Sequence, residues 1–238
     1  MSGLAGTTPV RTERDGPPPG PVPLEVHRLG VVPYTEALER QRALVASRQA
    51  GAIPDQLLLL EHPPVITVGV SARGHRRHLL ATPGQLEQRG IELYEAPRGG
   101  DVTYHGPGQL IGYPILDLRP DRCDVHRYVR DLEGALIATV AAFGVRASRA
   151  DGLTGVWVGN DKLAAIGVRL SRWVTSHGFA LNVDTRLEDF DLIVPCGLAG
   201  RGVTSLERLL GSAPSRREVE ERLVTELGRL LGRSPRAA

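Results

Sequence analysis

Apolar and polar residues alternate in short blocks along the first hundred residues, and most of these blocks have the length of a strand. Short apolar runs of this kind are typical of strands. After Pro33, apolar residues instead recur at helical spacing, and proline suits the first turn of a helix. The expected elements are a strand from Leu24, a helix from Pro33, strands at 57–60 and 65–68, a short helix from Thr82-Pro83 and a strand at 91–94.

The second half of the chain predicts a long helix, an antiparallel meander and two closing helices. Asp124 suits the cap of a helix whose apolar face continues to Gly144, a residue typical of helix ends. Gly159-Asn160-Asp161 suits a tight hairpin turn, and the Ser/Thr-x-x-Glu pattern of a capping box occurs twice near the C-terminus. The expected elements are strands at 102–104 and 110–118, a helix over 124–144, strands at 155–158, 163–170 and 179–183, and helices that start at Thr204 and Ser215.

These elements predict an α/β fold in which helices flank a mixed, largely antiparallel sheet. Residues 1–23 are rich in proline and glycine and offer little to bury, so we expect a disordered tail there. Residues 24–238 contain no repeat and no linker and are expected to form a single domain. Residues 233–238 are expected to fray.

Composition narrows the possible partners. Lys and Arg number 29 and Asp and Glu 27, too even a balance for a protein that neutralises a phosphate backbone, so we expect no nucleic-acid partner. The apolar runs are too short to cross a bilayer, and we expect no membrane association and a cytoplasmic protein. The two cysteines, Cys123 and Cys196, cannot form a disulfide framework and have no metal-ligand spacing, so no metal is expected.

The glycine-rich segment from Arg98 to Gln109 is the first candidate for chemistry. It carries neither the dinucleotide fingerprint nor a phosphate-binding loop, and it leads into a strand where those motifs require a helix. A glycine-rich surface turn remains an alternative to a binding site. Arg98, Thr103 and His105 favour a site, because they place a cation, a hydroxyl and a titratable ring where backbone can approach a ligand.

Cys196 is the candidate nucleophile, although a lone cysteine is often only a small buried residue. It lies in a loop rich in proline and glycine, where backbone N–H groups are available to a reacting carbonyl. Cys123 lies in a polar run and is interpreted as incidental. The remaining histidines are expected to be loop or surface residues: His27, His62, His75, His78, His126 and His177.

Four motifs follow one another along the chain: Arg98–Gln109 with Gly112-Tyr113-Pro114, then Lys162–Gly167, His177–Asn182 and Pro195–Leu198. This ordered series resembles that of the lipoate-biosynthesis octanoyltransferases. The resemblance implies a fold shared with lipoate and biotin protein ligases. It also implies transfer of an octanoyl group from acyl carrier protein to a lysine of lipoyl domains, in 2-oxoacid dehydrogenase complexes and in the glycine-cleavage carrier protein.

Carried over position by position, the resemblance makes Cys196 the residue that holds the acyl group as a thioester and Lys162 the residue that lowers its pKa. A thioester donor and an amide product need no ATP, so no cofactor is expected. Ile166, Phe179 and Leu181 are candidate linings for the acyl chain, and Arg73, Arg76 and Arg77 for a docking patch. The implied substrate-binding residues are Arg98, Gly99, Gly100, Asp101, Val102, Thr103, Tyr104, His105, Ala165, Ile166, Gly167, Gly178, Phe179 and Ala180.

Two alternatives remain open. An ATP-dependent lipoate protein ligase has the same fold but activates its acid as an adenylate and needs no cysteine. A non-catalytic module that binds acyl carrier or lipoyl domains would need neither Cys196 nor Lys162 for its function.

Overall fold

The structure is a computed structural model that describes residues 22–72, 74, 77–120, 122–194 and 200–238. Most of the predicted tail lies outside these ranges. The first strand nevertheless begins at Val22, two residues inside the segment expected to be disordered.

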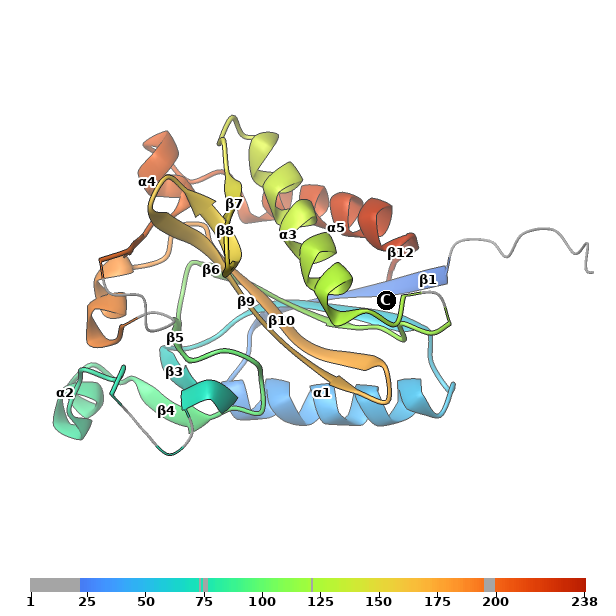
Figure 1. Cartoon of the computed structure of the whole chain (residues 1–238), viewed down its shortest axis with the longest axis horizontal. Coiled ribbons are helices and arrows are strands. Elements are labelled where there is room, and N and C mark those ends of the chain that lie inside the picture. Colours follow the sequence, from blue (N-terminus) through green and yellow to red (C-terminus); the bar gives the residue numbers. More distant parts are fainter. Residues whose placement is uncertain (1–21, 73, 75–76, 121, 195–199) are drawn as a thin grey trace, which may run out of the picture.

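One large sheet organises the described residues (Figure 1). Its strand order is β12-β1-β2-β6-β10-β9-β8-β7, and β11 also pairs with β9. The pairs of β1 with β2 and β12 and of β9 with β11 are parallel, and the others are antiparallel. The strands are β1 (Val22–Val31), β2 (Asp55–Glu61), β6 (Gln109–Ile115), β7 (Ser148–Ala150), β8 (Leu153–Val158), β9 (Asp161–Ser171), β10 (Val174–Asn182), β11 (Gly202–Val203) and β12 (Arg233–Ala237).

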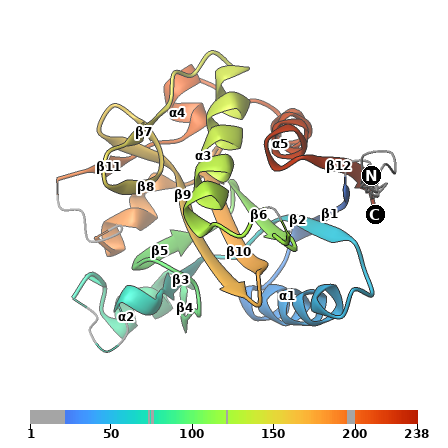
Figure 2. The same ribbon diagram turned by 45° about the vertical axis from the view of Figure 1, so that its right-hand side comes forward.

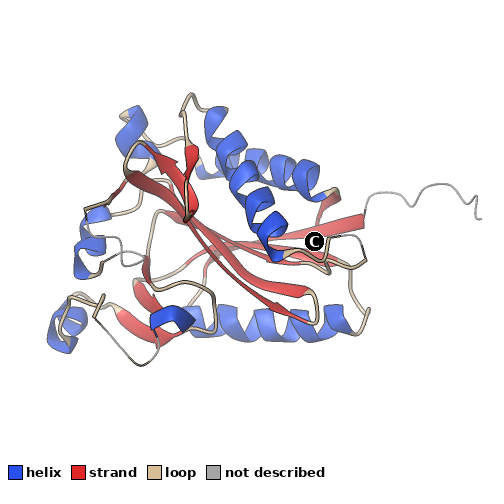
Figure 3. Ribbon diagram, viewed as in Figure 1, coloured by secondary structure: helices blue, strands red, loops and turns tan. Residues whose placement is uncertain are grey.

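A smaller sheet, in the order β4-β3-β5, lies beside the large one (Figure 3). Its strand β5 carries part of the glycine-rich segment into the middle of the molecule. The strands are β3 (Val65–Val68), β4 (Glu92–Glu95) and β5 (Val102–His105). The helices are α1 (Tyr34–Gln49), α2 (Pro83–Gln88), α3 (Val125–Ala141), α4 (Leu206–Leu210) and α5 (Arg216–Leu231), with 3₁₀ turns η1 (Val70–Ala72) and η2 (Leu187–Leu192).

Helices cover both faces of the large sheet. α3 and α5 lie on one face and α1 on the other, as Figures 1 and 2 both show. Strand β2 is buried on both sides because its apolar residues alternate: Leu57 and Leu59 join the core beneath α3 and α5, and Leu58 and Leu60 join the core beneath α1. The predicted fold class is confirmed.

The helix N-caps show where the local sequence was sufficient to predict the start of a helix. The Asp124 carboxylate accepts from the backbone N–H groups of His126 and Arg127, as predicted, and the capping box of Ser215 forms in full. The box predicted at Thr204 is wrong. Ser205 caps α4 instead, because the backbone N–H of Thr204 donates to the carbonyl of Lys162 and so continues the strand pairing of β11.

The prediction that the C-terminus frays is also wrong, because β12 pairs in parallel with β1. Arg233 anchors it: its Nε lies 2.6 Å from Oδ2 of Asp55, and both side chains are buried. Asp55 also accepts from Arg48 at 2.7 Å. Removing one partner of such a pair leaves a buried charge uncompensated, so this contact holds the last strand against the sheet.

Among the described residues, none of the helices is both long and apolar enough to cross a membrane.

Candidate active site

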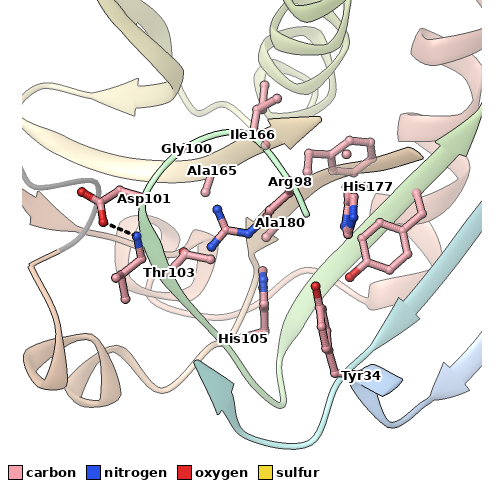
Figure 4. Close-up of a pocket in the computed structure, with 15 residues that line it drawn as sticks. Tyr34, Arg98, Gly100, Asp101, Thr103, His105, Ala165, Ile166, His177 and Ala180 are labelled. Atoms are coloured by element: carbon pink, nitrogen blue, oxygen red, sulfur yellow. Dashed lines mark hydrogen bonds between the residues drawn. The ribbon is translucent and has the colours of Figure 1, made fainter. Parts of the chain in front are cut away.

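The β9–β10 hairpin covers a cavity of about 50 Å³ that most of the sequence-predicted substrate residues line. We call it the central cavity. Tyr34, Tyr113 and His177 also line it, and the motif analysis did not single out the side chains of these three as binding residues. The predicted residues that line it are Arg98, Gly100, Asp101, Val102, Thr103, His105, Ala165, Ile166, Gly167, Gly178, Phe179 and Ala180. Figure 4 shows Thr103 toward one end and His177 toward the other, with Arg98 between them.

Two predicted residues and one candidate lining residue lie elsewhere. Gly99 faces a separate open groove of about 490 Å³ between the glycine-rich loop, α3 and β9. The Tyr104 side chain points to the other side of β5, where its hydroxyl donates to Oδ2 of Asp189 at 3.0 Å. Leu181 is packed in the core beneath α3 and α5. Strand alternation explains Tyr104, because its neighbours Thr103 and His105 take the cavity side.

Arg98 fixes the glycine-rich loop from inside. Its buried guanidinium donates through Nη2 to the carbonyl and hydroxyl oxygens of Thr67, at 2.7 and 2.8 Å, and through Nη1 to the carbonyl of Gly99 at 3.1 Å. These charge-assisted bonds join the loop to β3. Arg98 therefore forms one wall of the cavity and places a positive charge beside its histidines.

The glycines of the site allow close approach of one backbone to another. A Cβ on Gly167 would lie 2.8 Å from the carbonyl oxygen of Gly99, so the loop packs directly on β9. A Cβ on Gly178 would lie 2.2 Å from the carbonyl oxygen of Gly112 in β6. Because real Cβ atoms do not come so close, only glycine allows the backbones to touch at these two positions.

Two buried histidines, His105 and His177, line the central cavity, and a third, His62, packs behind its wall. The prediction that His177 is a loop or surface residue is wrong, since it is buried in β10, whereas His62 lies in the loop after β2 and is buried there. The His62 ring packs 5.9 Å from that of His105, and its Nε2 lies 2.8 Å from the Tyr113 hydroxyl. Burial holds the pKa of His62 and of His177 at about 4 and that of His105 at about 3. The Arg98 charge lowers the pKa of His105 and His177 further, so all three rings are neutral at pH 7.

A hydrogen-bonded chain fixes the orientation of His105. Its Nδ1 donates to Oε1 of Gln109 at 2.7 Å, and the Gln109 amide donates to Oδ1 of Asn182 at 2.9 Å. Asn182 in turn donates to the carbonyl of Thr204 at 3.0 Å. The chain runs from the cavity to the residue that follows β11, and it leaves Nε2 as the unprotonated nitrogen of His105.

Lys162 lies at the other end of the hairpin from His177. Its backbone pairs with Trp157 on one side and Val203 on the other, and its side chain is only 6% exposed. The ammonium lies 4.7 Å from the centroid of the Trp157 ring, a cation–π contact. Lys162 lines both the open groove and a small cavity that shares Thr103, Ala165 and Ala180 with the central cavity. We call this small cavity the Lys162 cavity.

Cys196 lies outside the described residues, as do Arg73, His75 and Arg76. The residues on either side of 195–199 are described. The backbone N–H of Val194 donates to the carbonyl of His78 at 2.8 Å, and the carbonyl of Gly200 accepts from Asn160 at 2.9 Å. Strand β11 then pairs with Asp161 and Lys162. The chain that follows Cys196 therefore returns to Lys162.

Within the described residues, no group of three or more His, Cys, Asp and Glu side chains could hold a metal ion.

Comparisons with known proteins place this geometry in a family. The model of the lipoyl protein ligase A/B catalytic domain matches residues 33–228. An octanoyltransferase from Chloroflexus aurantiacus is 52% identical over 216 residues, which are 90% of this chain and 96% of that protein. An octanoyltransferase from Solibacter usitatus is 56% identical over 205 residues, which are 86% of this chain and 91% of that protein.

The fold agrees with the family. A solved structure of a bi-partite lipoate protein ligase from Thermoplasma acidophilum superposes with a TM-score of 0.70 and 15% identity, covering 91% of this chain and 87% of that one. Fold and family model define an enzyme of the lipoyl protein ligase A/B class. Within this class, the chain belongs to the octanoyltransferase family of acyltransferases. The resemblance seen in the four motifs is thereby confirmed.

Proposed function

We propose that this enzyme transfers an octanoyl group from octanoyl-acyl carrier protein to a lysine of lipoyl domains, through a thioester on Cys196. The acceptors are the lipoyl domains of 2-oxoacid dehydrogenase complexes and the glycine-cleavage carrier protein. The observation that carries the proposal is the position of Lys162. This cation is buried in the Lys162 cavity, which adjoins the central cavity through shared lining residues, and it lies next to the strand that follows Cys196.

The first half-reaction loads the enzyme. The Cys196 thiolate attacks the thioester carbonyl, the carrier's thiolate leaves, and the octanoyl chain lies along β9 in the central cavity. A free cysteine has a pKa of about 8.5, and a neighbouring ammonium lowers it. Lys162 supplies that charge and protonates the departing thiolate.

The second half-reaction delivers the acyl group. The amine of the acceptor lysine attacks the Cys196 thioester, an amide forms, and Cys196 leaves as a thiolate. Lys162, now neutral, takes the proton that the attacking amine loses, so each cycle restores both groups. The open groove, which Lys162 also lines, gives the carrier and the acceptor lysine access to the thioester. Two half-reactions on one thiol predict ping-pong kinetics.

Intact-mass spectrometry tests the proposal. We expect the wild-type enzyme, mixed with octanoyl-acyl carrier protein without ATP, to gain the mass of one octanoyl group and to lose it when a lipoyl domain is added. Cys196→Ser should acquire no thioester and should transfer roughly 10⁶-fold more slowly, as when another catalytic nucleophile is removed. Lys162→Ala should load slowly, and its thiol should be alkylated only at higher pH because the cation is gone.

Cys123 provides the matched control, because it is the exposed free cysteine of the described residues. Cys123→Ser should load and transfer at the wild-type rate. Loading that persists in Cys196→Ser would refute the nucleophile. Transfer that requires ATP and octanoate would identify the enzyme as a ligase instead.

A further inference from the structure

Three cavities follow one another beneath the β9–β10 hairpin. The Lys162 cavity comes first, and the central cavity shares Thr103, Ala165 and Ala180 with it. A third cavity of about 210 Å³ lies between α1 and the far end of the hairpin, and we call it the α1 cavity. Among the described residues that line the central and α1 cavities, only His177 is common to both.

His177 is held rigidly in this position. Its backbone has φ of +55°, a conformation that costs energy for a side chain other than glycine, and its N–H donates to Oε1 of buried Gln41 at 2.7 Å. The ring packs edge-on against Tyr113, with centroids 6.1 Å apart. The contact with Gln41 joins the hairpin to α1, so the ring forms a fixed wall.

The distance from the Lys162 cavity to the His177 ring suits a medium-length acyl chain, as measured from Ala165, which lines both the Lys162 cavity and the central cavity. His177 is paired with Val168 across the hairpin, and Ala165 lies three residues before Val168. Three residues of strand span roughly 10 Å. Beyond the wall, Leu38 and Val45 of α1 give the α1 cavity apolar surface, beside the polar side chains that also line it.

We propose that His177 determines acyl chain length, by ending the acyl site at the central cavity and closing it from the α1 cavity. This inference rests on the proposed function. A longer chain must either displace a packed ring or fold back within a cavity that has no spare room. Removing the ring joins the two cavities and lets the chain continue along α1.

The test uses His177→Gly, because glycine adopts φ of +55° without strain and the change leaves the backbone bond to Gln41 intact. The measurement is kcat/KM for transfer to a lipoyl domain from octanoyl-, decanoyl- and dodecanoyl-acyl carrier protein. We expect the dodecanoyl-to-octanoyl ratio to rise by roughly tenfold or more, since the two chains differ by four methylenes and even one methylene in an apolar pocket is worth about tenfold discrimination. His177→Asn, whose shorter side chain also tolerates positive φ, should raise the ratio less.

Trp173→Gly is the matched control. Trp173 lies in the same hairpin and also has a positive φ, of +66°, but its side chain is exposed and lines neither cavity. Its chain-length profile should equal that of the wild type. Adding Val45→Phe to His177→Gly should refill the α1 cavity and reduce the ratio toward the wild-type value, while Val45→Phe alone should leave octanoyl transfer unchanged.

The outcomes separate the two proposals. A wild-type enzyme that transfers no acyl group from carrier protein would overturn the proposed function. Octanoyl transfer with the same chain-length ratio in His177→Gly and Trp173→Gly would overturn the chain-length role alone. A raised ratio that Val45→Phe does not reduce would show that long chains leave by another route, and would equally refute it.

Discussion

The two faces of the large sheet are built differently. Apolar side chains fill the face that α3 and α5 cover. The face toward α1 and the small sheet instead combines glycine, histidine and tyrosine around the central cavity. Leu132 and Leu136 of α3 and Leu223 and Leu227 of α5 are completely buried on the first face. On the second face, three neutral histidines and the Arg98 guanidinium are buried instead. The same strands supply both faces through alternation of their side chains.

This difference determines which kind of change destabilises each face. A face filled by large side chains is damaged when atoms are removed, because a void loses contacts on all sides. A face built on touching backbones is damaged when atoms are added, and one with buried histidines is damaged by protons. Three changes test this contrast.

The largest effect on stability is expected from Leu132→Ala, which removes a completely buried side chain from α3. The free energy of unfolding should fall by about 2–5 kcal/mol, the range for such truncations in protein cores. Transfer activity per folded molecule should stay unchanged, because Leu132 lines none of the cavities described above. Urea denaturation and the transfer assay measure the two quantities.

Leu209→Ala is the control, because Leu209 is exposed on α4 and its truncation should change stability by less than about 0.5 kcal/mol. If Leu132→Ala reduced activity per folded molecule as strongly as stability, the two faces would be coupled and the contrast would not hold.

A smaller loss of stability, together with a loss of activity, is expected from Gly178→Ala. The new methyl group would lie 2.2 Å from the Gly112 carbonyl, so β6 and β10 must separate or shift. Overfilling of this kind costs about 1–3 kcal/mol. Because Gly178 also lines the central cavity, octanoyl transfer should slow even at temperatures where the variant is folded.

Gly84→Ala supplies the comparison, since Gly84 lies in α2 with open space around it and no positive φ. It should be neutral or slightly stabilising. A Gly178→Ala enzyme as stable and active as Gly84→Ala would mean that the close approach of β6 and β10 is not required.

The third effect concerns pH and is the smallest when it is counted per histidine and per pH unit. The pKa values of about 4, 3 and 4 for His62, His105 and His177 lie below the value of 6.5 for an unburied histidine. The unfolded chain therefore binds protons that the folded protein excludes, and the free energy of unfolding should fall as the pH drops below about 6.5. The loss should level off only near the folded pKa values. Each of these histidines contributes about 1.4 kcal/mol per pH unit where it is fully titrating.

His105→Gln should keep a donor toward Gln109. It should reduce the slope of the free energy of unfolding against pH by the contribution of about one proton, as measured by urea denaturation between pH 7 and 5. His126→Gln, on the exposed start of α3, is the control and should leave the slope unchanged. An unchanged slope in His105→Gln would show that His105 is not the neutral, buried group described above.

Much of the fold could be predicted from local pattern, and the exceptions have physical causes. The helical spacing after Pro33 and Asp124 located α1 and α3, because one face of each helix packs on the sheet. Twelve of the fourteen substrate-binding residues that the motif series implied line one cavity. β12 was missed because its stability comes from pairing with β1 and from the buried contact between Arg233 and Asp55, and a short polar segment carries no sign of either.

The sequence by itself determined the alternation of the strands, the amphipathic helices, the capping of α3 and α5 and the family motifs, because each depends on residues close together in the chain. Only the tertiary structure decided that His62 and His177 are buried and that Lys162 lies beside β11. It also decided that His177 stands between two cavities. These properties arise from contacts between residues distant in sequence, such as that of His177 with Gln41, which no local pattern encodes.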